Sequence, residues 1–133
     1  MWRCPNCRAV ALLAGLLLAL TLTACGRVAT SAGPGGATVA DGNVGRGEQA
    51  IVKYGCGSCH IIPGVGNARG LIGPPLLKFS RRGYIAGEIT NTPDNLVFWI
   101  MQPQAVEPGT VMPNMGVTDS DARDIAAYLY TLK

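Results

Sequence analysis

The segment with the most potential chemistry in this chain is Cys56-Gly57-Ser58-Cys59-His60. Thiolates and imidazoles bind transition metals, and two cysteines at this spacing can also form a redox-active disulfide. A Cys-x-x-Cys pair followed at once by His is, in addition, the sequence at which a haem is attached through two thioether bonds. The segment is therefore compatible with three chemistries: metal binding, thiol redox exchange and covalent haem attachment.

The rest of the chain separates these three chemistries. A structural zinc site needs four ligands, but His60 is the single histidine, and the other cysteines, Cys4, Cys7 and Cys25, lie in or at the end of an N-terminal export signal described below. A thioredoxin-like pair belongs in a βαβ unit, which this region lacks, and a plain disulfide leaves the adjacent His unexplained. The motif thus predicts one covalent haem c, held by Cys56 and Cys59, with His60 as one axial ligand of the iron.

The second axial ligand is less determined by the sequence. With one His, the ligand is Met, another weak donor, or nothing. Met101 lies at the end of a predicted helix, which favours a core role. Met112 stands between Pro108-Gly109-Thr110-Val111 and Pro113, a stiff segment that would present a thioether at a fixed place. Met112 is the first candidate and Met115 is the alternative.

The N-terminus has the pattern of an export signal. Residues 1–8 are short and basic, and residues 9–22 are an unbroken apolar run, too short for the roughly 20 residues of a membrane span. Leu22-Thr23-Ala24-Cys25-Gly26 resembles the lipobox of bacterial lipoproteins. That resemblance implies removal of residues 1–24 and a diacylglyceryl group on Cys25. An uncleaved signal anchor with an incidental Cys remains the alternative.

Three regions follow from this pattern: a signal peptide over residues 1–24, a lipidated N-terminus and flexible linker over 25–43, and one domain over 44–133. Gly-rich coil of the linker's length spans about 25 Å. The expected location is a bacterial membrane, facing the periplasm or the cell exterior. Cys4 and Cys7 precede the apolar run, so their zinc-like spacing is interpreted as incidental.

Charge excludes one class of partner. The net charge is +3, and without Arg3 and Arg8 the balance is close to neutral. The basic footprint of a nucleic-acid-binding protein is therefore absent, and no nucleic acid is expected as a partner.

The elements that must position the site are predicted to be helices. One is expected over about 44–56, capped by Asn43 or Asp41, and a Gly-punctuated loop over 55–73 follows it. Thr92-Pro93 begins a second helix that Pro103 ends. Thr118 caps a third, over about 118–132, with apolar residues at helical spacing. The expected fold is all-α, with three to four helices around one haem.

The domain resembles the class I cytochromes c over residues 44–133. The resemblance rests on the Cys56–His60 motif and on three further segments in the family's order: Gly73-Pro74-Pro75-Leu76, Pro108-Gly109-Thr110-Val111-Met112-Pro113 and Ala127-Tyr128-Leu129. It implies that Met112 is the sixth ligand. It also implies that the Pro74 carbonyl accepts a hydrogen bond from His60, and that Leu76 and Trp99 pack against the haem.

Other details are left open by the resemblance. The first and last helices of the family cross closely, and Gly45 or Gly47 would permit that contact opposite Tyr128. Apart from Gly73–Leu76, the stretch between Gly70 and Thr92 follows no family pattern. The groups that meet the haem propionates are therefore unassigned among a set of candidates: Arg69, Lys78, Arg81, Arg82, Tyr84 and Trp99.

His and Met on a covalent haem leave no open position for a substrate, and this favours an electron carrier over an enzyme. The expected function is single-electron transfer in a respiratory chain between redox proteins, with a terminal oxidase as the candidate partner. The alternative is a haem enzyme or gas-binding cytochrome, such as a peroxidase or a sensor, whose Met112 detaches.

Overall fold

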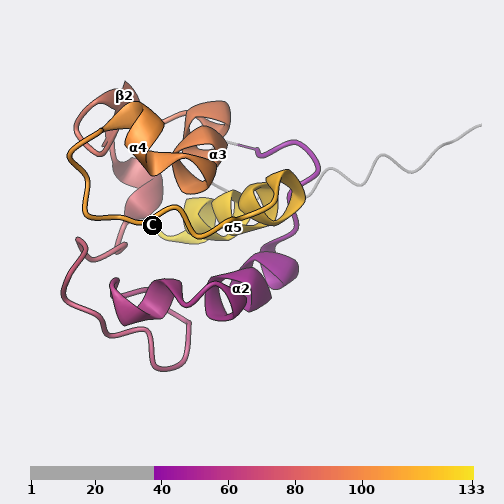
Figure 1. Ribbon diagram of the computed structural model, residues 1–133. Coiled ribbons are helices and arrows are strands. Elements are labelled where there is room, and N and C mark those ends of the chain that lie inside the picture. The colour runs from indigo at the N-terminus through magenta and orange to yellow at the C-terminus, as the bar shows by residue number, and fades with distance from the viewer. Residues whose placement is uncertain (1–37) are drawn as a thin grey trace, which may run out of the picture. The chain divides into compact units, whose positions relative to one another are not determined.

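The computed structural model describes residues 38–133, whose regular structure is mainly helical (Figure 1). The predicted signal peptide, Cys4, Cys7, Cys25 and most of the predicted linker lie outside the described residues. The elements, in chain order, are helix α2 (Val44–Lys53), the short 3-10 helices η1 (Cys56–Ser58) and η2 (Phe79–Arg81), strands β1 (Tyr84–Ile85) and β2 (Ile89–Thr90), and helices α3 (Pro93–Met101), α4 (Pro103–Val106) and α5 (Asp119–Thr131).

The three main helices begin at the predicted capping residues. The Asn43 side chain, rather than Asp41, accepts a hydrogen bond from the backbone of α2, and Thr92 and Thr118 do the same for α3 and α5. Helix α2 ends at Lys53, before the predicted residue 56, because Gly55 adopts a left-handed conformation with φ of 66°. That turn separates the helix from the cysteine motif.

Helices α2 and α5 cross in contact, and the crossing depends on Gly47 rather than Gly45 (Figure 1). A Cβ atom on Gly47 would collide with the backbone carbonyl of Asp124 and lie 3.0 Å from the Tyr128 Cβ, whereas one on Gly45 would meet only Asn43 at 3.5 Å. The missing side chain therefore lets the first helix lie directly on the last.

A buried carboxylate fixes the same crossing. Asp124 is 2% exposed and accepts hydrogen bonds from the Asn43 backbone at 2.6 Å and from Arg46 Nε and Nη2 at 2.6 and 2.8 Å. These bonds satisfy both carboxylate oxygens, as a buried charge requires.

The packed domain begins before residue 44. The predicted flexible linker includes residues 39–43, yet Val39 packs against the core. Gly42 lies so close to α5 that a Cβ there would be 2.7 Å from the Arg123 carbonyl. The absence of a side chain at Gly42 thus permits close packing against α5.

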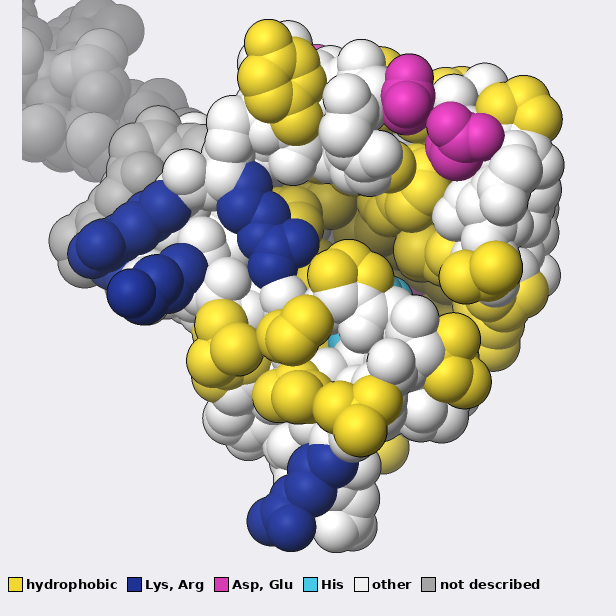
Figure 2. All heavy atoms as spheres, turned by 90° about the vertical axis from the view of Figure 1, so that its left-hand side faces the viewer, with side chains coloured by type: hydrophobic (Ala, Val, Ile, Leu, Met, Phe, Trp, Pro, Cys, Tyr) yellow, Lys and Arg dark blue, Asp and Glu magenta, His cyan; other side chains and the backbone are white. Residues whose placement is uncertain are grey.

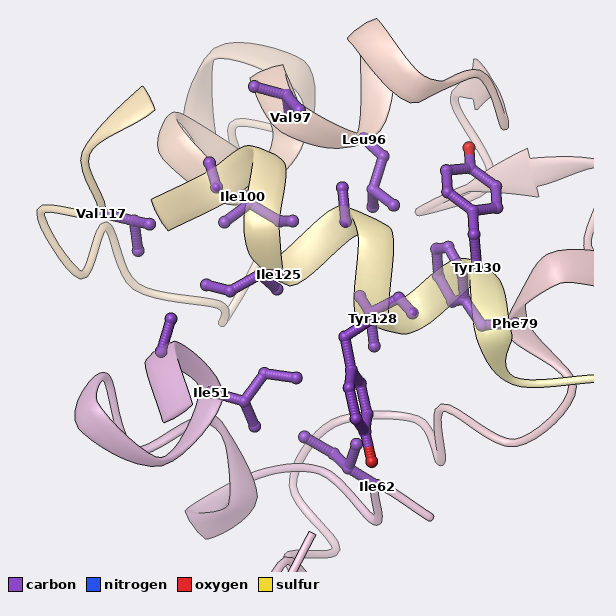
Figure 3. Packing of buried hydrophobic residues seen from close by; sticks show 14 of the residues in the cluster. Ile51, Ile62, Phe79, Leu96, Val97, Ile100, Val117, Ile125, Tyr128 and Tyr130 are labelled. Atoms are coloured by element: carbon purple, nitrogen blue, oxygen red, sulfur yellow. The ribbon is translucent and has the colours of Figure 1, made fainter. Parts of the chain in front are cut away.

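The core lies between α2, α3 and α5 (Figure 3). Ile51 from α2, Leu96 and Ile100 from α3 and Ile125 and Leu129 from α5 are all at most 6% exposed.

The β1–β2 hairpin was not predicted. No helix among residues 38–133 is long and apolar enough to cross a membrane.

Candidate haem site

The cysteine motif forms one tight turn. Within it, the backbone N–H groups of Cys59 and His60 both donate to the Cys56 carbonyl, at 3.3 and 3.1 Å. The two cysteines are half-buried and form no disulfide. Burial raises the pKa of the Cys56 thiol, with a smaller contribution from the neighbouring Cys59. A raised pKa makes the Cys56 thiol a poorer redox nucleophile.

The His60 ring is held by the loop that follows the motif. Its Nδ1 lies 2.8 Å from the Pro74 carbonyl, as the family resemblance implied. Because a carbonyl only accepts, Nδ1 carries the proton and Nε2 remains free to bind a metal. A Cβ on Gly73 would collide with the ring, so glycine is needed there, and the Gly73 N–H donates to the Cys59 carbonyl at 2.8 Å.

A cavity of about 480 Å³ lies beside this histidine. Its walls are mainly apolar, and separate segments bring Cys56, His60, Met112 and Met115 to it. Figure 2 shows the hollow on the molecular surface, with hydrophobic side chains around it and the histidine visible inside. A volume of this size is within the range of cofactor pockets. A thiol, an oriented imidazole and thioethers at one apolar cavity fit a covalent haem.

Most of the predicted haem contacts line the cavity. Pro74, Leu76 and Trp99 do so together with Met112. Cys59 is half-buried beside the cavity-lining Cys56 but is not itself part of the wall. Both Met112 and Met115 line the cavity, so the walls alone do not distinguish the two thioethers.

Met101 does not line the cavity and packs against the core, as predicted from its place at the end of a helix.

The structure also sorts the candidates for the haem propionates. Arg82 and Tyr84 line the cavity, as Trp99 does, whereas Arg69, Lys78 and Arg81 do not. Arg82 is half-buried, its guanidinium lies 5.3 Å from the centre of the Phe79 ring, and its Nη2 donates to the Pro75 carbonyl. It is therefore the best-placed cation of the set.

Sequence reasoning missed the hairpin that closes part of the cavity. Ile85, Ala86 and Gly87 belong to it and line the wall, as does Phe79 from η2. Ala86 and Gly87 both have positive φ, 55° and 84°. Positive φ is uncommon for alanine, so nothing in the sequence marked this turn.

A family model described as cytochrome c matches residues 44–133. The chain belongs to the cytochrome c family. A curated relative, cytochrome c oxidase subunit 2 of Alkalihalophilus pseudofirmus, is 36% identical over 89 residues, which cover 66% of this chain. Those residues cover 25% of the relative, so the chain spans about a quarter of that protein's length. No solved structure matches the chain significantly.

Membership of the family indicates which cofactor the cavity binds. Cytochromes c bind haem c covalently, and the fold of residues 38–133 is the small helical fold expected of such a haem electron carrier.

Proposed function

We propose that this protein is a membrane-tethered cytochrome c with one haem, which carries single electrons in a respiratory chain. The observation that carries the proposal is the apolar cavity at which Cys56, His60 and Met112 come together. A haem bound there supplies an iron that alternates between the ferrous and ferric states, at a potential raised by a His and Met ligand pair.

The chain's own residues each have a role in this proposal. Cys56 and Cys59 supply the two thioether bonds. The Pro74 carbonyl orients His60 and increases its basicity, while Gly73 leaves room for its ring. Apolar walls exclude water from the iron's surroundings. Without water, the ferrous iron, which has the lower net charge, is stabilised relative to the ferric iron, and the reduction potential rises.

The proposed partner is a terminal oxidase. Support comes from the similarity to a protein named as an oxidase subunit and from the surface around the cavity. Ile72 and Val111 are 71% and 79% exposed, and both line the cavity. Exposed apolar residues at the mouth of a redox site are suited to a transient protein contact.

The proposed tether is a lipid on Cys25, which lies outside the described residues. Support comes from the lipobox-like segment at the end of the apolar run. In a Cys25→Ser variant the protein should leave the membrane fraction, and the acyl mass on the N-terminal peptide should be lost. Retention in the membrane without any acyl mass would instead indicate a signal anchor.

The electron-carrier proposal is tested by spectroscopy and by turnover together. The purified full-length protein should titrate as a single reversible one-electron couple, with a low-spin spectrum in the ferric state. The reduced protein should then be reoxidised by membranes that contain the native oxidase, and cyanide should stop this reaction. A high-spin ferric haem that reacts with peroxide would contradict the proposal and favour a haem enzyme.

A further inference from the structure

The segment between α4 and α5 presents two thioethers to the cavity. Met112 and Met115 both line it, although residues 107–118 form no helix or strand. A ligand on an irregular segment depends on other groups to hold it at a fixed place. One of the two methionines is held by such contacts.

Both hydrogen-bonding groups of the Met112 backbone are bound by side chains. Gln104 Nε2 donates to the Met112 carbonyl at 2.7 Å, and the Met112 N–H donates to Thr110 Oγ1 at 3.2 Å. In the described part of the chain no hydrogen bond reaches the backbone of Met115. Its neighbours bond each other instead, since Asn114 Oδ1 accepts from the Gly116 N–H at 2.9 Å.

Gln104 is itself well anchored. It is the second residue of α4, whose first residue, Pro103, is less than 2% exposed, and α4 packs against α3. The Glu107 N–H donates to the Pro103 carbonyl at 2.9 Å, and the Thr110 N–H donates to the Glu107 carbonyl at 3.0 Å. The groups on each side of Met112 are thus fixed to the same short helix.

We infer that Gln104 is a positioning residue that, with Thr110, holds Met112 at the cavity as the distal iron ligand. This inference rests on the proposed function. Gln104 is exposed, so its side chain contributes little to the core, and its hydrogen bond acts on the peptide of the ligand residue. The bond does not involve the thioether, so it restricts the loop without competing for the sulfur.

The test is the affinity of imidazole for the ferric, haem-loaded full-length protein, because imidazole binds only when the distal methionine leaves. In Gln104→Ala we expect imidazole to bind about two- to fivefold more tightly, the change that one exposed neutral hydrogen bond represents. The side chain in Gln104→Glu has the same shape but no donor at neutral pH. The affinity of this variant for imidazole should therefore rise at least as much as that of Gln104→Ala. Gln102→Ala, two residues away, is the matched control and should behave as wild type.

Two further readouts distinguish positioning from folding. Far-UV circular dichroism should be unchanged in all variants, while the reduction potential should fall in both Gln104 variants. Wild-type imidazole affinity in Gln104→Ala would overturn the inference and leave the proposed function intact. Wild-type imidazole affinity in Gln104→Glu, with tighter binding in Gln104→Ala, would also overturn the inference and leave the proposed function intact. Lost packing of the side chain would then explain the effect of Gln104→Ala. A wild-type protein without methionine ligation would overturn both.

Discussion

At the scale of single residues, the properties of the haem depend on which thioether binds the iron. Met112 follows a Pro-Gly-Thr-Val segment, and its backbone is held by Gln104 and Thr110, whereas Met115 is 46% exposed. These differences favour Met112, although both residues line the cavity. The choice between them can be measured directly.

Met112→Ala should open the distal position, because the contacts of Gln104 and Thr110 are made to the backbone and remain in the variant. The reduction potential should fall, and carbon monoxide should bind the reduced protein readily. Absorption spectroscopy with a carbon monoxide titration checks this. Met115→Ala is the matched control and should stay low-spin. If the two variants behave the other way round, Met115 is the ligand.

Tyr130 lowers the stability of the folded protein at alkaline pH. Burial raises the pKa of its phenol from 10.0 to about 12, and its hydroxyl donates to Asn91 Oδ1 at 2.9 Å. The unfolded chain therefore loses this proton from about pH 10, while the folded protein keeps it up to about pH 12. Since the folded state then binds more protons, its stability falls as pH rises through this window.

Tyr130→Phe should reduce this alkaline loss of stability, although it also removes the bond to Asn91. Urea unfolding at pH 9 and at pH 11.5 measures the difference in free energy for each protein. Tyr84→Phe, which removes a tyrosine that is 64% exposed, is the control and should keep the wild-type pH dependence. An equal alkaline loss in Tyr130→Phe would show that other groups are responsible.

At the scale of elements, the contact between α2 and α5 is the most extensive between helices of residues 38–133. Gly47→Ala would place a methyl group against the Asp124 carbonyl, so the helices would have to separate. We expect a loss of about 3 kcal/mol in the free energy of unfolding. Gly45→Ala has room for the methyl group and should gain about 0.5 kcal/mol from helix propensity. Chemical denaturation of the pair checks this, and equal effects would contradict the crossing.

The sequence predicted the elements whose signals are local. The caps Asn43, Thr92 and Thr118 and the apolar spacing of α5 were sufficient for the three main helices. The hairpin was missed because each strand has two residues and its turn begins with an alanine at positive φ. The end of α2 was placed too late, because the sequence did not show that Gly55 would turn left-handed.

In the candidate site, too, the residues that could be predicted are those with a local sequence signal. The Cys56–His60 motif is a local pattern with a known chemical use, and the bond between His60 and Pro74 followed from the family resemblance. The choice of Arg82 over Arg69, Lys78 and Arg81 depends on which side chain the fold turns toward the cavity. Spacing along the chain contains no such information.

At the scale of the whole molecule, charge is distributed unevenly. Residues 38–133 hold all 8 acidic residues and have no net charge, yet no acid occurs between residues 49 and 87. Four cations of that stretch take part in no ion pair among the described residues: Arg69, Lys78, Arg81 and Arg82. Figure 2 shows Lys and Arg side chains beside the opening of the cavity. A partner with an acidic contact surface would therefore be oriented toward the opening.

Arg81→Gln should slow electron transfer to oxidase-containing membranes several-fold at low ionic strength, with the difference vanishing at high salt. Stopped-flow oxidation of the reduced protein measures this. Arg123→Gln removes the same charge from an i,i+4 pair with Asp119 on α5 and should have little effect. Equal slowing by both variants would mean that net charge, and not its location, controls the encounter.

Covalent attachment of haem by Cys56 and Cys59 is tested most directly by the intact mass of the protein made in cells that attach haem to exported proteins. The wild-type protein should show a mass increase of one haem that survives denaturation, and the Cys56→Ala/Cys59→Ala variant should show none. A wild-type protein without covalent haem, or a double variant that retains it, would rule out this attachment.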